Sequence, residues 1–155
     1  MTSTRFCGPA PKATGRSHVK GIRAQTRALI LLACLAISAH ASKRGVVFQI
    51  STDSPQTWIV AVHNVHNLQQ ALLPHHARIE IIAFGRGLRM LLKTSPVARA
   101  LLALHQSGVT IDACKKSVLK QGLPPADMSP VVHYIPSGIA EIVRREREGW
   151  AYVRP

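Results

Sequence analysis

The sequence predicts one α/β domain with a five-stranded parallel sheet that helices cover on both faces. Five short runs rich in β-branched and aromatic residues are separated by segments with helical spacing of apolar residues. Such alternation is typical of βαβ units, which place their strands in parallel. The chain has 155 residues, which suits one ordinary domain, and 46% of them are hydrophobic, which is enough for a core.

The first expected strand, 45–51 (GVVFQIS), combines β-branched and aromatic side chains. A helix is expected to follow from Pro55 to about Leu72. Ser54 suits the N-cap of this helix and Pro55 its first turn. The helix is amphipathic because apolar residues recur at helical spacing: Trp58, Ala61, Val62, Val65, Leu68 and Leu72.

The second strand is expected at 77–84 (ARIEIIAF), and the glycine-containing loop 85–87 closes it. A helical turn at 88–92 and a helix at 96–106 should follow, the helix with one apolar face. Residues 109–113 (VTIDA) then form the third expected strand.

The C-terminal part of the chain begins with a short helix at 115–119 and a proline-containing loop at 121–130. The remaining expected elements are a strand at 131–135, a helix at 138–148 and a strand at 150–154. The sequence RREREG at the end of that helix is most simply interpreted as a charged, solvated helix face.

The formal net charge is +13, and an excess of this size raises nucleic acid and anionic membranes as partners. The distribution of the charge weakens this inference. Residues 1–41 carry six of the 20 Lys and Arg residues and none of the seven acids. About half of the basicity therefore lies in the N-terminal segment, and no nucleic-acid partner is predicted for the domain.

Residues 1–41 are predicted to be a secretory signal peptide. A polar, basic n-region precedes the apolar h-region 28–38 (ALILLACLAIS), and Ala39-His40-Ala41 resembles a cleavage motif. The h-region is shorter than the ~20 residues that span a bilayer. Cleavage after Ala41 would leave domain 42–155 in the periplasm or outside the cell, without a stable membrane span. The alternatives are an uncleaved anchor, a wrong start site and a buried helix.

The three cysteines are Cys7, Cys34 and Cys114, and none of them belongs to a CxxC pair. The spacing therefore indicates neither a zinc site nor a dithiol motif. Cleavage would remove the first two and leave Cys114 as the only thiol of the mature chain.

Cys114 is expected at the end of the third strand, directly before Lys115, Lys116 and Ser117 begin a short helix. Backbone amides at a helix N-terminus and two nearby cations favour thiolate over thiol, and the thiolate is the reactive form. Ser117 either donates a hydrogen bond to the sulfur or caps the helix. The alternative for Cys114 is a small, inert residue of the fold.

Ligands of open parallel sheets bind beyond the carboxyl ends of the strands. Cys114 should lie there together with the loop 51–54, which contains Asp53, and the loop 84–87. Gly85 and Gly87 would allow close backbone approach to a ligand. Arg86 between them is a candidate contact for an anion.

These segments resemble the DsrE/DsrF family of sulfur-relay proteins. The matching pieces occur in the family's order over residues 45–155: VVFQIS with the following Asp53 and Trp58, IEIIAFGRGLRMLL, SPVA, GVTIDACKKS, VVHYIPS and GWAYVRP. Cys114 and Ser117 match the family's Cys-x-x-Thr/Ser pattern. The resemblance implies a three-layer α/β/α fold, assembly into trimers or hexamers, and a persulfide on Cys114 that passes to a partner protein.

Other chemistries have weaker support. His63 and His66 have helical i, i+3 spacing, but no acid or thiol supplies a third ligand, so no metal is predicted. The absence of a P-loop, a GxGxxG motif and a serine nucleophile motif argues against a hydrolase or a dehydrogenase, and no cofactor is expected.

Two functions from different classes remain open. The first is an exported carrier of sulfur on Cys114, with a donor or acceptor protein as partner. Carriage is stoichiometric, so the sequence leaves open whether the protein is an enzyme. The second is a non-catalytic oligomeric binding or scaffold protein for a small anionic ligand or a protein partner, with Cys114 as a residue of the fold.

The predicted signal peptide gives a direct test of export. N-terminal sequencing of protein recovered from the host's periplasmic fraction should begin at Ser42 or within a few residues of it, because Ala41 ends the cleavage motif. Recovery of full-length chain from the cytosol alone would contradict export, and would keep Cys7 and Cys34 in the mature protein.

Overall fold

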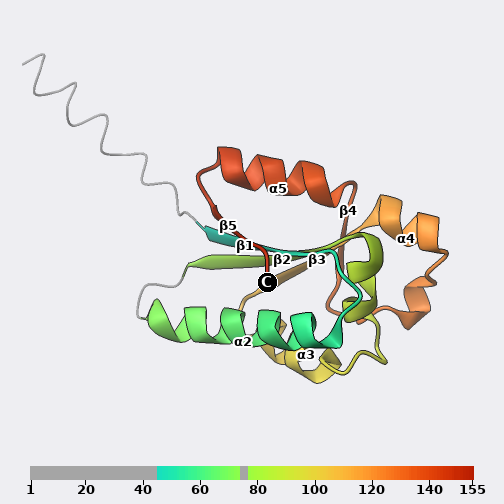
Figure 1. The fold of residues 1–155 in the computed structure, drawn as a ribbon, viewed down its shortest axis with the longest axis horizontal. Helices are drawn as coiled ribbons and strands as arrows, with labels where there is room; N and C mark the ends of the chain where they lie inside the picture. The colour runs from blue at the N-terminus through green and yellow to red at the C-terminus, as the bar shows by residue number, and fades with distance from the viewer. Residues whose placement is uncertain (1–44, 74–76) are drawn as a thin grey trace, which may run out of the picture. The chain divides into compact units, whose positions relative to one another are not determined.

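The computed structural model describes residues 45–73 and 77–155, so the predicted signal peptide lies outside the described residues. The described chain forms a five-stranded sheet with the strand order β4-β3-β2-β1-β5. Every pairing in the sheet is parallel. Helix α5 lies on one face of the sheet, and α2 and α3 lie on the other (Figure 1). The predicted α/β fold, with helices on both faces of a parallel sheet, is confirmed.

The strands agree closely with the predicted ranges. They are β1 (Gly45–Ile50), β2 (Arg78–Ala83), β3 (Thr110–Cys114), β4 (His133–Ile135) and β5 (Ala151–Val153). Strand β4 is shorter than the predicted 131–135. The reason is that the N–H of Val132 donates to the carbonyl of Ser129 in a turn, at 3.2 Å, before the chain joins the sheet.

The helices are α2 (Pro55–Ala71), α3 (Ala98–Gln106), α4 (Lys115–Gln121) and α5 (Gly138–Arg147). Two 3₁₀ helices, η1 (Gly85–Leu91) and η2 (Pro125–Asp127), lie in segments predicted as loop or turn. Ser54 caps α2 by accepting from the N–H of Thr57, as the sequence predicts. Among the described residues, no helix is long and apolar enough to cross a bilayer.

The larger part of the core lies between the sheet and the helices α2 and α3. Side chains alternate along each strand, so every second residue of β1, β2 and β3 faces this layer. They meet the apolar faces of α2 and α3, and the buried cluster includes Phe48, Ile50, Ile81, Ile111, Ala113, Trp58, Val65 and Leu101. Full burial of such a side chain is worth about 1.5–3 kcal/mol each.

The opposite face of the sheet packs against α5. Its apolar cluster is small: Val47, Ile82, Ile142 and Trp150. The same face of the sheet also carries the buried carboxyl side chains of Glu80 and Asp112, which alternate with residues of the larger core. The two sides of the sheet are therefore chemically different, because the α5 side carries both of these buried carboxyl groups.

The glycine-rich segment after β2 packs tightly against the end of β1. A Cβ atom at Gly87 would lie 2.3 Å from the carbonyl oxygen of Ile50 and 2.8 Å from the nitrogen of Ser51. The N–H of Phe84 donates to the same carbonyl at 3.0 Å. The sequence predicts that Gly87 allows close approach to a ligand, but in the structure the backbone that approaches it closely is that of β1.

Gly87→Ala should destabilise the protein strongly, because backbone atoms of β1 cannot rotate away from the added methyl group. We expect a loss of about 3 kcal/mol, at the upper end of typical overpacking costs. Gly108→Ala is the matched control, since Gly108 has a φ of +93° but no atom within 4 Å of the added Cβ. That control should cost about 1 kcal/mol from backbone strain alone. Equal losses for the two variants in urea unfolding would contradict the steric explanation.

Candidate functional site

Cys114 is the last residue of β3 and the N-cap of α4, as predicted. Gly138, Ser117 and Lys116 lie around its sulfur, and hydrogen bonding by their backbones and by the Ser117 side chain lowers the pKa of the thiol. Gly138 is the first residue of α5. The pairing of Cys114 with Ile135 on β4 brings the start of α5 beside the end of β3. The N-termini of two helices therefore meet at one sulfur atom.

Burial and hydrogen bonding act in opposite directions on the thiol. Only 5% of Cys114 is exposed. Burial raises the pKa of the Cys114 thiol, but the hydrogen bonds from Gly138, Ser117 and Lys116 outweigh it and hold the pKa below its usual value. The thiolate is therefore less disfavoured than burial alone would make it.

Lys115 and Lys116 lie at the start of α4 with exposed side chains. The main causes of the lowered pKa of Cys114 are hydrogen bonds, to which Lys116 contributes its backbone N–H. The stabilisation of the thiolate that the sequence attributes to helix amides thus has a structural basis. A role for the two ammonium groups stays a prediction.

Ser117 contacts the sulfur through its side chain. Its Oγ also accepts a hydrogen bond from the N–H of Gly85, at 3.0 Å. Of the two roles considered for Ser117, capping is wrong because Cys114 is the N-cap of α4, and donation to the sulfur stays a prediction. Through Gly85, the loop after β2 reaches the same site, as expected for neighbouring strands.

Asp53 and Arg86 form part of a separate surface cluster. The carboxylate of Asp53 pairs with Arg86 at 3.5 Å and with Arg89 at 3.2 Å. The side chain of Arg86 is 78% exposed, and ion pairs at such a surface contribute little to stability. The proposed contact of Arg86 with an anion near Cys114 stays a prediction.

His63 and His66 lie exposed on α2. Within the described ranges, no three His, Cys, Asp or Glu side chains come together in a way that could hold a metal ion. A cavity of 220 Å³ lies instead at the amino ends of β2 and β3, and Arg78 and Val109 line it. The carboxyl edge with Cys114 is the opposite edge of the sheet, so this cavity has no part in thiol chemistry.

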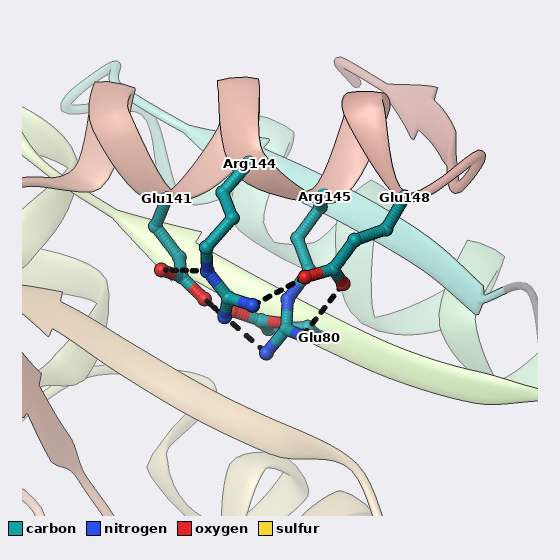
Figure 2. A network of polar contacts seen from close by, with 5 residues as sticks. All are labelled: Glu80, Glu141, Arg144, Arg145 and Glu148. Carbon is teal, nitrogen blue, oxygen red and sulfur yellow. Dashed lines mark hydrogen bonds and ion pairs between the residues drawn. The ribbon is translucent and has the colours of Figure 1, made fainter.

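A buried ionic network, which the sequence patterns did not predict, lies beneath α5. Glu80 on β2 is 1% exposed, and its Oε2 lies 2.5 Å from Nε of Arg145. Arg145 also pairs with Glu141 at 3.2 Å and with Glu148 at 3.3 Å. Figure 2 shows the side chains of α5 directed toward Glu80, with Arg144 between Glu141 and Glu148.

The interpretation of the charge run as a purely solvated helix face is therefore wrong for Arg145. Its side chain is only 18% exposed, and its guanidinium lies 4.4 Å from the ring centre of Trp150. The sequence contained a signal for this network. Glu80 interrupts the apolar strand IEIIA and Asp112 the apolar strand TIDAC, and a charged residue in a buried strand requires a partner.

The two buried carboxyl groups hold a proton near neutral pH. Burial raises the pKa of Glu80 to about 8, and a hydrogen bond to Asp112 adds to the increase, while Arg145 opposes it. Burial also raises the pKa of Asp112, whereas the hydrogen bond from Glu80 lowers it. One proton on this pair of carboxyl groups leaves a single negative charge close to the guanidinium of Arg145.

The fold and the site together define a small α/β protein with a buried cysteine at the carboxyl end of a strand in a parallel sheet. No family model and no curated protein matches the chain. Among solved structures, it is similar to MTH1491, a protein of unknown function from Methanobacterium thermoautotrophicum. The identity is 34%, the TM-score is 0.68, and the match covers 72% of this chain and 99% of that one. The chain therefore belongs to the same family as MTH1491.

A second solved structure has the same fold at greater distance. BT1422 from Bacteroides thetaiotaomicron, a conserved protein of unknown function, shares 18% identity with a TM-score of 0.59. The match covers 76% of this chain and 99% of that one. At this identity the likeness shows the fold alone.

The stability of the protein should fall as the pH rises from about 5 to about 8. The pKa of Glu80 is about 8 in the folded protein against 4.5 for the free side chain, so the folded state binds the proton more tightly. This contribution is complete below pH 4.5 and is lost as the pH rises through the folded value. Urea unfolding across this range measures the slope.

Glu80→Gln should reduce this pH dependence, because the amide cannot ionise. Asp112 retains a smaller dependence of the same sign, since its pKa is also raised. Glu146→Gln is the matched control on the exposed side of α5 and should keep the original slope. Equal slopes for Glu80→Gln and the unmodified protein would show that the buried carboxyl does not titrate as described.

Proposed function

We propose that this protein carries sulfur as a reversible persulfide on Cys114. The observation that supports the proposal is the set of N–H donors around the sulfur, which holds the pKa of the thiol below its usual value in spite of burial. The resemblance to DsrE/DsrF proteins points to the same residue and the same chemistry.

The transfer step is a thiol–persulfide exchange. The Cys114 thiolate attacks the outer sulfur of a donor R–S–S⁻, the S–S bond of the donor breaks, and the donor leaves as the thiolate R–S⁻. One sulfane sulfur moves, and no net oxidant is needed. In the return step an acceptor thiolate attacks the outer sulfur of the Cys114 persulfide. The S–S bond breaks, the outer sulfur stays on the acceptor, and Cys114 leaves as a thiolate.

The residues around the sulfur have matching roles in both steps. The N–H groups of Gly138 and Ser117 and the side chain of Ser117 stabilise negative charge on sulfur, which is present both on the attacking thiolate and on the persulfide. The exposed ammonium groups of Lys115 and Lys116 would attract an anionic donor toward this edge. Gly85 supports Ser117 from the neighbouring loop.

Export and assembly complete the proposal. Cleavage after Ala41 would deliver the domain to the periplasm or outside the cell, with Cys114 as its only thiol. The resemblance supports a trimer or hexamer and a sulfur donor or acceptor protein as partner. The chemistry needs no cofactor, because the sulfur atom of Cys114 is both nucleophile and leaving group.

The second candidate is a non-catalytic binding or scaffold protein. The observation that favours it is the 5% exposure of Cys114, since buried thiols are usually inert. On this reading the hydrogen bonds to the sulfur hold α4 and α5 at the edge of the sheet. The two functions differ in whether Cys114 reacts in the native protein.

Incubation of the purified protein with polysulfide should add one sulfur atom, about 32 Da, to Cys114. Peptide mapping by mass spectrometry locates the adduct, and a reductant should remove it. Cys114→Ser is the control and should fold normally without carrying the adduct at this position. Modification of Cys114 only after unfolding in urea would contradict sulfur carriage and support the scaffold function.

A further inference from the structure

We propose that the outer face of helix α4 is a docking surface for an acidic segment of a partner protein. Four residues form this face, here termed the α4 surface: Lys115, Lys116, Leu119 and Lys120. The inference goes beyond the proposed function, because docking does not require that Cys114 carry sulfur. Where the proposed function holds, the docked partner would be the sulfur donor or acceptor.

The four side chains share one face because of helical geometry. Residues i, i+1, i+4 and i+5 of an α-helix project within an arc of about 140°. In α4 these are positions 115, 116, 119 and 120, and all four residues are exposed. The opposite face packs on the protein, since Val118 is buried and the side chains of Ser117 and Gln121 form hydrogen bonds with the backbone of Gly85. The packing of α4 therefore directs three ammonium groups and one leucine side chain to solvent.

Leu119 is the most exposed large hydrophobic residue of the described chain, at 80%. The other large hydrophobic residues at the surface are between 40% and 54% exposed. Lys115 and Lys116 lie one turn before Leu119 on the same face, and Lys120 follows it directly. An apolar centre within a polar rim is typical of a protein–protein interface. A partner that covers Leu119 would remove its side chain from water, which favours binding.

The three lysines of the α4 surface take part in no ion pair with the described residues 45–73 and 77–155. Most acidic residues lie elsewhere in the fold. Five of the seven are on α5 or in the strands beneath it: Glu80, Asp112, Glu141, Glu146 and Glu148. The complement to the charge of the α4 surface is therefore an acidic group on another molecule.

Positive charge continues from α4 onto the neighbouring segment η1. Strands β3 and β2 lie side by side, and α4 and η1 follow their carboxyl ends (Figure 1). The side chains of Arg86 and Arg89 on η1 are 78% and 58% exposed. These two guanidinium groups share the single carboxylate of Asp53, so η1 keeps a net positive charge. The attraction for an acidic partner therefore extends beyond α4 and would speed its approach.

The composition of this region favours a protein over nucleic acid and over an anionic membrane. Surfaces that bind single-stranded nucleic acid combine cations with aromatic side chains that stack on bases. Neither α4 (KKSVLKQ) nor η1 (GRGLRML) contains an aromatic residue. A helix that binds a membrane surface inserts a broad apolar face, whereas α4 exposes one leucine. Asp53 would repel a uniform polyanion, but a folded partner can place its acidic groups away from this carboxylate.

The experiment measures the binding of labelled acidic peptides to the full chain by fluorescence anisotropy. The peptides have about ten residues, all glutamate except for one leucine that occupies a different position in each, and an all-glutamate peptide is the reference. The best leucine peptide should bind more tightly than the reference. Its Kd should rise at least about threefold between about 20 mM and about 200 mM NaCl, because salt screens exposed charges.

Variants of the α4 surface identify the residues that bind. Replacement of its three lysines by Gln should weaken the best peptide by about tenfold, since each exposed ion pair contributes about 0.5 kcal/mol. Leu119→Gln should weaken the leucine peptide by about fivefold and leave the all-glutamate peptide unchanged. The matched control removes three exposed cations elsewhere and should bind as the unmodified protein does: Arg99→Gln, Arg147→Gln and Arg154→Gln. Thermal unfolding checks that each variant is folded, and Lys120→Glu alone should also weaken binding if the triple variant does not fold.

Three results would overturn the inference. The first is a failure of every peptide to bind, and the second is equal weakening by the α4 and control triple variants, which would show attraction by net charge alone. The third is tighter binding of single-stranded DNA or phosphatidylglycerol vesicles than of any peptide, lost in the α4 variants, which would assign the surface to nucleic acid or membrane. Peptide binding by Cys114→Ser, combined with no sulfur uptake by the unmodified protein, would remove the proposed function and leave the docking surface intact.

Discussion

The contact between Arg145 and the buried carboxyl group of Glu80 links the packing of the sheet to the surroundings of the thiol. A carboxyl group in a central strand is costly to bury, and Arg145 offsets this cost only when α5 lies directly over β2. The position of α5 in turn fixes its first residue, Gly138, whose N–H reaches the sulfur of Cys114. The same helix, α5, therefore brings Arg145 to Glu80 and Gly138 to Cys114.

The two ends of α5 have different environments. At its C-terminal half, Arg145 lies between Glu80 and the ring of Trp150, so the guanidinium is both paired and covered. At its N-terminus, Gly138 packs so closely on the sheet that an added Cβ would lie 3.0 Å from the ring of Phe84 and 3.2 Å from the side chain of Ile82. Glycine at this position lets the helix start approach the sheet and cover the sulfur almost completely.

The pKa of the Cys114 thiol results from two opposing effects. Burial disfavours the charged form, whereas three backbone N–H groups and one serine side chain favour it. Stabilisation by fixed dipoles requires no mobile cation, and it persists when the site excludes water.

The sequence by itself determined the alternation of strands and helices, the parallel sheet, and the place of Cys114 between β3 and α4. These features depend on local patterns: apolar periodicity, the Ser54 cap, and helix-forming residues after a buried strand. Only the tertiary structure decided that β5 pairs with β1, that Arg145 turns inward to Glu80, and that α5 begins at Gly138 beside Cys114. These contacts join residues distant in the chain, and their geometry depends on how α5 and α4 pack on the completed sheet.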